Sequence, residues 1–315
     1  LQRLSEWVDQ CLAKLKQYTN DIHICGNRNS FSKTDHDATF MHMKEDYMRN
    51  GQLKPGYNVN VATCSDFIIG SYISSDRNDV HTLIPFMEQL RKNYAGRNIG
   101  SVVVDSGYES EENYCWFEAH PETELYVKPS NHEAAKHRKY RTDISRRENM
   151  AYDAQTDTYT CANGKLLQRT QEKKMHTASG LEIATSVYEC NECDGCPLKE
   201  KCIRACGSKK PLEERYKVIY VSKRFARQRQ AMEAKISSPK GCLLRVNRSI
   251  QAEGNFAYVK QDLDFRRFLL RGNMKVAAEW LLFSLALNIL HLHHKIQNRR
   301  LGSDLKIPSS FPAGL

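Results

Sequence analysis

The chain has 315 residues and carries 47 Lys and Arg against 37 Asp and Glu, which gives a formal net charge of +10. A chain of this length forms one large domain or two ordinary ones and buries a substantial core, although only 40% of its residues are hydrophobic. The longest apolar stretch, residues 281–292, is too short to cross a bilayer, and charges occur throughout the first ten residues. We therefore expect no membrane span and no secretory signal, and we predict a cytoplasmic protein.

The first half of the chain alternates between predicted helices and strands. Apolar residues at three- and four-residue spacing predict an amphipathic helix over residues 1–18, which either pairs with another chain or packs into a core. Six further elements follow: a strand over 57–64, its hairpin partner over 67–74 after a Ser65-Asp66 turn, a helix over 82–94, a strand over 101–105, a helix over 109–120 and a strand over 125–129. This order predicts an α/β fold with helices against a mixed sheet.

The second half changes in character at about Lys136. From there to Tyr220 the sequence is polar, rich in Lys and Arg and rich in turns, with short predicted strands, and we interpret it as an insertion subdomain. Helical periodicity returns over residues 221–236 and 247–295, and the tail after Gln297 is predicted to be irregular.

Two acidic residues stand out. Asp105 ends the apolar strand VVVD, where ligands gather in open α/β sheets; the alternative is an Asp that caps the next helix or makes an Asx turn. Glu253, Phe256 and Lys260 share one stripe of a predicted helix, so a carboxylate and an ammonium on one face could hold a cation and an adjacent phosphate. The alternative for this stripe is a solvated face around a core Phe256.

Five cysteines crowd into the segment from Cys190 to Cys206, and the other six are scattered. The spacing of Cys190, Cys193, Cys196 and Cys202 predicts a tetrahedral thiolate site, for which zinc is the usual structural metal. Cys161 or Cys206 could replace one ligand, an iron–sulfur cluster is an alternative, and so are unliganded thiols.

Two basic runs accompany the Glu253 helix and favour contact with a polyanion such as DNA, the alternative being solvated faces. They consist of Lys223, Arg224, Arg227 and Arg229, and of Arg266, Arg267, Arg271 and Lys275.

Seven segments in one order resemble a known family. They are TDHDATFM, NGQLKPGYNVNVAT, RNDVHTLIP, VVVDSGYESEENY, a cysteine cluster ending in CPLKEKC, RSIQAEGNFAYVK and FRRFLLRGNMKVAAEW. Together they resemble the DDE transposases of bacterial insertion sequences over nearly the whole chain. The resemblance implies an RNase H-like mixed sheet flanked by helices and interrupted by the cysteine-rich insertion. The implied domains are a helical lead-in (1–29), the first part of the core (30–135), the insertion (136–220), the helical part with Glu253 (221–297) and an irregular tail (298–315).

The resemblance also implies the site residues. Asp105 would be the second catalytic aspartate and Glu253 the catalytic glutamate, holding two Mg²⁺ (or Mn²⁺) ions, with Lys260 on a phosphate near the cleaved end. Of the related Tyr-Arg-Glu-Lys signature only the Glu-to-Lys spacing is kept, because Val246 and Ser249 replace its first two members. Arg248 lies one place away, and we predict DNA contacts for Arg248, Arg266, Arg267 and Arg271.

The first aspartate of the family belongs to an Asp-Gly-Thr-like strand that this chain lacks, so we expect it upstream of Leu1 and regard the chain as the carboxy-terminal portion of such an enzyme. Asp35 or Asp37 is the alternative, and Asp79 is expected to be structural. The implied function is metal-dependent cleavage and transfer of double-stranded DNA at the element's inverted repeats and target, by a homo-oligomer. The alternatives are a catalytically inactive DNA-binding remnant and a zinc-dependent binding module.

Overall fold

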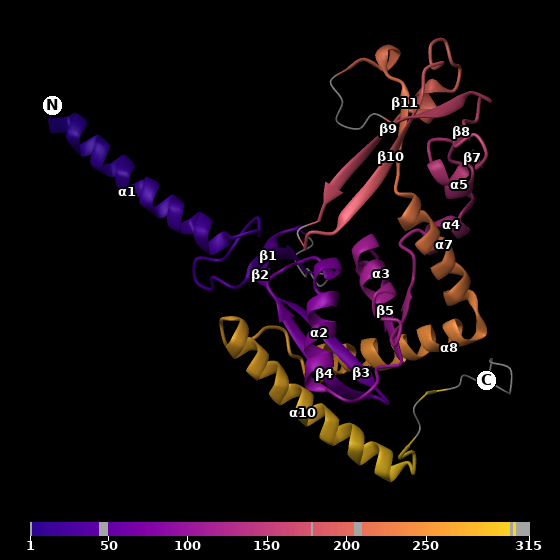
Figure 1. Ribbon diagram of the computed structural model, residues 1–315. Helices are drawn as coiled ribbons and strands as arrows, with labels where there is room; N and C mark the ends of the chain where they lie inside the picture. The colour runs from indigo at the N-terminus through magenta and orange to yellow at the C-terminus, as the bar shows by residue number, and fades with distance from the viewer. Residues whose placement is uncertain (1, 44–49, 178, 205–209, 303–304, 307–315) are drawn as a thin grey trace. The chain divides into compact units, whose positions relative to one another are not determined.

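The computed structural model describes residues 2–43, 50–177, 179–204, 210–302 and 305–306 (Figure 1). Contacts divide the chain into two compact units: unit 1 comprises Leu1–Ile99 and Cys242–Leu315, and unit 2 comprises Gly100–Gly241. The helix α8 (Pro239–Arg248) runs from unit 2 into unit 1. Unit 2 is therefore one continuous segment inserted between two parts of unit 1.

Unit 1 begins with a long helix and two antiparallel strand pairs. Its first elements are α1 (Gln2–Cys25), β1 (Thr39–His42), β2 (Leu53–Gly56), β3 (Asn58–Cys64), β4 (Phe67–Ser74), the 3₁₀ helix η1 (Asp79–His81) and α2 (Leu83–Asn93). β1 pairs with β2, and β3 pairs with β4. Ser65 and Asp66 join β3 to β4 with φ of 52° and 72°, the left-handed backbone of a two-residue hairpin turn, which confirms the predicted turn.

The second part of unit 1 is helical but not continuous. α8 leads into the π-helical turn η5 (Ser249–Glu253), the short helix α9 (Gly254–Ala257) and a second π-helical turn, η6 (Tyr258–Asp262); α10 (Asn273–Gln297) follows after a gap. The prediction of helix throughout 247–295 is wrong at residues 263–272. Phe265 and Phe268 from this segment pack against the core, and Gly272 has a φ of 87°, which interrupts the helix before α10.

The core of unit 1 lies between the β3–β4 hairpin and the helices of the second part. One buried cluster consists of Ile68 of β4, Val259 of η6 and Trp280 and Leu287 of α10, and α2 also buries Leu83, Phe86, Met87 and Leu90. The side chain of Asn288 accepts a hydrogen bond from the backbone N–H of Ile68 and donates one to its carbonyl, both at 2.8 Å, so α10 is attached to β4 by polar contacts as well.

α10 is also long and apolar enough to cross a membrane by length and composition, with a mean hydropathy of 1.4 over its most apolar 18 residues. The apolar stretch 281–292 is too short to cross a bilayer, whereas the whole of α10 is long enough and apolar enough. A single helix of this kind is a weak indication, because core helices meet the same criterion, and α10 packs on β4 through buried side chains.

Unit 2 starts with a parallel strand pair. β5 (Ser101–Val104) and β6 (Glu124–Val127) pair in parallel, joined by the 3₁₀ helix η2 (Ser106–Tyr108) and by α3 (Glu111–Glu118) (Figure 1). A second, antiparallel sheet has the order β11-β10-β9-β8-β7. Its strands and the remaining elements are α4 (His132–Lys136), α5 (Arg138–Arg141), η3 (Arg147–Asn149), β7 (Ala151–Asp153), β8 (Thr158–Thr160), β9 (Leu166–His176), β10 (Glu182–Cys190), α6 (Lys199–Cys202), η4 (Leu212–Glu214), β11 (Lys217–Val221) and α7 (Lys223–Ser237).

The mixed α/β class is confirmed, and every helix and strand predicted between residues 57 and 129 is present within a few residues of its expected bounds. The described strands form four separate sheets rather than one mixed sheet. The RNase H-like arrangement and the domain boundaries at 29, 135, 220 and 297 therefore stay predictions.

Candidate functional site

Asp105 lies directly after β5, at the carboxyl end of the parallel strand pair, as predicted. Its side chain is exposed, and its Oδ1 accepts a hydrogen bond from the backbone N–H of Ser106 at 2.7 Å, which caps η2. The alternative of a cap for the helix that begins near Glu111 is wrong, because Ser110 caps α3 by accepting from the backbone N–H of Asn113. Asp105 caps only the 3₁₀ helix η2, and its carboxylate still presents a charge at the end of the strand.

The loop after Asp105 is held by a buried ion pair. Glu109, whose side chain is 1% exposed, accepts two hydrogen bonds of 2.8 Å from the guanidinium of Arg229 on α7 and one of 2.7 Å from the backbone N–H of Ser130. Burial raises the pKa of Glu109, but the Arg229 and Ser130 contacts outweigh it and hold that pKa below its ordinary value. Two residues on, Glu111 pairs with Arg224 at 2.7 Å. α7 therefore fixes the position of the segment that carries Asp105.

Glu253 lies in unit 1, at the end of the π-helical turn η5. The opposite face of this helix is buried through Gln251, Asn255 and Val259, whereas Glu253 and Lys260 are exposed and Phe256 packs on Trp280. The predicted arrangement of an exposed carboxylate and ammonium beside an anchoring Phe256 is present. π-helical turns shift the helical register and are frequent at functional sites, and here one ends at Glu253 and the next contains Lys260.

Arg248 forms an ion pair with Glu253. Its guanidinium lies 2.7 Å from one carboxylate oxygen of Glu253, and the hydroxyl of Ser249 donates to the other at 3.0 Å. The prediction that Arg248 contacts DNA stays a prediction; in the structure its guanidinium pairs with the glutamate that the sequence singled out.

The other predicted DNA-contacting residues lie in the non-helical segment 263–272 or, in the case of Lys260, just before it. Arg267 and Lys260 are exposed, and the described residues show no hydrogen bond or ion pair for either charged group. Arg266 pairs with Asp264 at 2.6 Å while its side chain stays 41% exposed. Arg271 donates to the carbonyl of Thr34 at 3.3 Å.

Asp35 and Asp37 hold the start of α10. The backbone N–H of Asn273 donates to Asp37 at 2.8 Å, that of Gly272 donates to Asp35 at 3.2 Å, and the hydroxyl of Tyr57 donates to Asp35 at 2.7 Å. Carboxylates at a helix amino terminus are stabilised by its free N–H groups and its dipole. These contacts explain both acids without catalysis. Asp79 accepts from the Asn58 amide at 2.7 Å, in keeping with its expected structural role.

The sequence pattern does not single out a third acid of unit 1, Glu279. Glu279 of α10 is buried and accepts hydrogen bonds of 3.0 Å from the backbone N–H groups of Leu269 and Leu270. Together with Asp35 and Asp37 it holds the segment that carries the arginines. Glu279 falls within an apolar run, and only its position in a buried face distinguishes it from a surface glutamate.

The basic run on α7 is largely neutralised. Lys223 pairs with Asp157 at 2.7 Å, Arg224 with Glu111 and Arg229 with Glu109. Burial raises the pKa of Asp157, but Lys223 and the hydroxyls of Tyr188 and Tyr152 bring it down to about 2. Of the four residues predicted here, Arg227 is the exposed one.

The cysteine cluster is partly buried. Cys190 and Cys193 belong to a core cluster of unit 2 with Leu167 and Tyr188, and Cys161 packs against it. Cys196 accepts a contact of 3.5 Å from the Asn163 amide, and Cys193 accepts one of 3.4 Å from the backbone N–H of Lys217. Burial raises the pKa of Cys190 to about 11. Cys206 lies outside the described residues.

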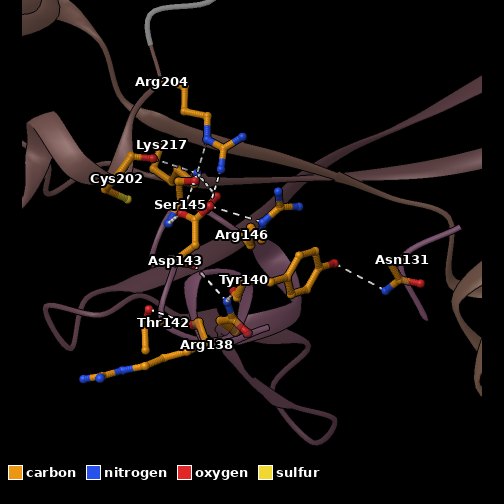
Figure 2. Close-up of polar contacts among 11 residues, drawn as sticks. Asn131, Arg138, Tyr140, Thr142, Asp143, Ser145, Arg146, Cys202, Arg204 and Lys217 are labelled. Atoms are coloured by element: carbon orange, nitrogen blue, oxygen red, sulfur yellow. Dashed lines mark hydrogen bonds and ion pairs between the residues drawn. The ribbon is translucent and has the colours of Figure 1, made fainter. Parts of the chain in front are cut away.

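A polar network holds the cysteine-rich segment in place (Figure 2). Asp143 accepts from the hydroxyl of Ser145 at 2.6 Å and pairs with Arg204 and Arg146. The ammonium of Lys217 on β11 donates to the carbonyls of Ser145 at 2.7 Å and Cys202 at 3.0 Å. The network joins three parts of unit 2 through hydrogen bonds and ion pairs, so we assign it a structural role.

Within the described ranges, no group of three or more His, Cys, Asp or Glu side chains is arranged to hold a metal ion. Two hollows of about 640 and 550 Å³ contain none of the predicted site residues. Asp105 belongs to unit 2 and Glu253 to unit 1, so their approach to a common site stays a prediction.

Residues 160–293 match the family described as the transposase DDE domain. This range contains the cysteine cluster, Glu253, Lys260 and all the predicted arginines, and it excludes Asp105. No curated protein and no solved structure shows significant similarity to the chain. The match covers less than half of the chain and shows that this range is similar to a DDE transposase domain.

Proposed function

We propose that the chain belongs to a DDE transposase of a bacterial insertion sequence, which cuts DNA at the element's inverted repeats and joins it to a target in the cytoplasm. The family match around Glu253 is the observation that carries this proposal. It is supported by the exposed Asp105 at the end of a parallel strand and by the exposed Lys260 on the Glu253 helix.

The donor chemistry fits divalent cations. Asp105 and Glu253 are exposed carboxylates, the hard oxygen ligands that Mg²⁺ and Mn²⁺ take. Bound ions of this kind polarise a phosphodiester and activate the attacking hydroxyl. Arg248 and Ser249 orient the Glu253 carboxylate, while Lys260 and Arg267 supply positive charge for phosphates of the bound strand.

The test is metal-dependent nicking of a duplex that carries the element's end, by the full reading frame. Asp105→Asn keeps a cap for η2, and Glu253→Gln keeps an acceptor for Arg248, so neither change disturbs the fold. We expect each to lower the cleavage rate at least about 100-fold, because it removes a charged metal ligand. Asp262→Asn, an exposed acid nine residues after Glu253, is the matched control and should leave the rate unchanged. Unchanged cleavage in both ligand variants would refute the assignment.

The alternative is a DNA-binding remnant without catalysis. It predicts DNA affinity that falls steeply with salt and no strand scission in Mg²⁺ or Mn²⁺. A gel-shift titration beside the cleavage assay separates the two functions.

For the cysteines we propose a structural zinc site at Cys190, Cys193, Cys196 and Cys202, with an iron–sulfur cluster as the alternative. Their spacing supports it; of the four, Cys190 and Cys193 belong to one buried cluster. The metal content of the purified protein tests it: about one zinc per chain, lost in Cys196→Ser but kept in Cys64→Ser, is the expected result. Protein without zinc or iron overturns the site and leaves the transposase assignment standing.

A further inference from the structure

α1 presents an uncovered apolar stripe. None of its described residues is buried, and seven large apolar side chains are 42–72% exposed: Leu4, Trp7, Val8, Leu12, Leu15, Tyr18 and Ile22. Leu4, Val8, Cys11, Leu15, Tyr18 and Ile22 follow each other at alternating spacings of four and three residues. This 3.5-residue average is the repeat of helices that supercoil around another helix.

α10 carries a second stripe with the same spacing. One face of this helix packs on β4 through Trp280 and Leu287, while six large apolar side chains on the rest of its surface are 43–70% exposed: Leu281, Leu282, Leu285, Ile289, Leu292 and Ile296. Ala278, Leu282, Leu285, Ile289, Leu292 and Ile296 repeat the four-three alternation of α1 position for position. Because the pattern reads the same in both directions, the two stripes also match when the helices run antiparallel.

Hydrogen bonds of Arg28 attach the carboxyl end of α1 to the loop that holds α10. The guanidinium of Arg28 donates to the carbonyls of Ile24 and Cys25 in the last turn of α1 and to those of His36 and Asp37 beyond it. Asp37 in turn accepts the N–H of Asn273. In this arrangement both stripes are exposed in the same chain.

The exposed area is that of a stable interface. Thirteen large side chains, each roughly half exposed, present on the order of 1,000 Å² of apolar surface per chain, above the roughly 800 Å² that each partner of a standard interface buries. We infer that the occupant is a second copy of this chain, with α1 of each copy packed antiparallel against α10 of the other.

This dimer is isologous, since residue 15 of one copy meets residue 285 of the other and the reverse contact occurs as well. The six repeat positions of α1 then lie opposite the six of α10, with Cys11 opposite Ile289. The proposed dimer depends only on α1 and α10. Because it is measured without DNA, its test is independent of the cleavage assay.

Sedimentation equilibrium of the full chain without DNA gives the first test. We expect a dimer, and we expect Leu15→Glu and Leu285→Lys each to weaken self-association by roughly 100-fold or more, because a charge in an apolar seam lacks a partner. Lys16→Glu, beside the stripe on α1, should leave the dimer intact. Circular dichroism checks that each exposed substitution leaves the fold unchanged.

Mixing the two single variants tests the pairing itself. A heterodimer of Leu15→Glu with Leu285→Lys has one charged Glu–Lys contact and one unaltered contact, so the mixture should dimerise although neither variant does alone. In the Ile289→Cys variant, the introduced thiol should form a disulfide with Cys11 under mild oxidation, and peptide mapping should place that bond between two chains.

Four outcomes overturn the inference. They are a monomeric wild type, dimers that survive both charged variants, a disulfide in the Ile289→Cys variant that joins Cys11 to the introduced thiol of the same chain, and a loss of dimers in the α1 variant alone, which would indicate pairing of α1 with α1.

Discussion

The two basic segments, on α7 and at residues 263–272, differ in how many of their cations pair with carboxylates. On α7, Lys223, Arg224 and Arg229 all pair with carboxylates of unit 2, and the partner Glu109 is almost fully buried. In the segment 263–272 of unit 1, Arg266 pairs with the exposed Asp264, whereas Arg267 is exposed and Arg271 contacts only a carbonyl among the contacts described. A count of basic residues thus overstates the charge available to DNA, because part of it is neutralised inside the fold.

The largest expected effect is on stability, at α7. Arg229→Ala leaves the Glu109 carboxylate buried without its guanidinium and should lower the free energy of unfolding by about 3–5 kcal/mol. Arg227→Ala, the exposed neighbour on the same helix, should change it by less than about 0.5 kcal/mol. Urea unfolding of both variants measures the difference, and equal effects would break the contrast between paired and exposed cations.

A second expected effect is acid sensitivity of unit 2. Asp157 has a pKa of about 2 in the folded protein against an ordinary 3.8, so its ion pair stabilises the fold above pH 3.8 and this contribution is lost as the pH falls towards 2. After solvent screening the loss is about 1–2 kcal/mol. Asp157→Asn should remove this part of the pH dependence of unfolding; an unchanged profile would show that the Lys223 pair contributes nothing.

A third effect concerns the acids that anchor the arginine-bearing segment. Asp37→Ala removes the carboxylate that accepts the Asn273 N–H and should destabilise unit 1 by about 1 kcal/mol, the usual effect of losing a helix cap. Thermal unfolding measures it, with Asp262→Ala as the exposed control. If Asp37→Ala abolished cleavage while leaving the melting temperature unchanged, Asp37 would be a catalytic acid instead.

The smallest effect is on DNA binding, and it bears directly on the comparison. Arg267→Gln and Lys260→Gln should each reduce the slope of log affinity against log salt by about 0.9, the change for one lost phosphate contact in B-DNA. Lys223→Gln should leave that slope unchanged, because its ammonium is paired with Asp157. Gel-shift titrations at several salt concentrations measure the slopes. A larger change in Lys223→Gln than in Arg267→Gln would reverse our interpretation of the two segments.

Local patterns were sufficient for the elements around the site. Apolar alternation located β3, β4 and β5, and the Ser65-Asp66 turn joins the first two as predicted. The placement of Asp105 after a strand and the exposed stripe of Glu253 and Lys260 could also be predicted, because each depends on neighbours within a few residues.

Contacts over long sequence separations were beyond such patterns. Asp37 and Asn273 are 236 residues apart, and Glu109 and Arg229 are 120 apart. No periodicity shows that one residue of such a pair has a partner. The sequence by itself determined the class of elements, the positive charge and the candidate acids, since propensity and composition are local or additive. Only the tertiary structure decided which acids hold a helix, which cations are neutralised and which apolar faces stay exposed, because burial and pairing depend on segments that meet only after folding.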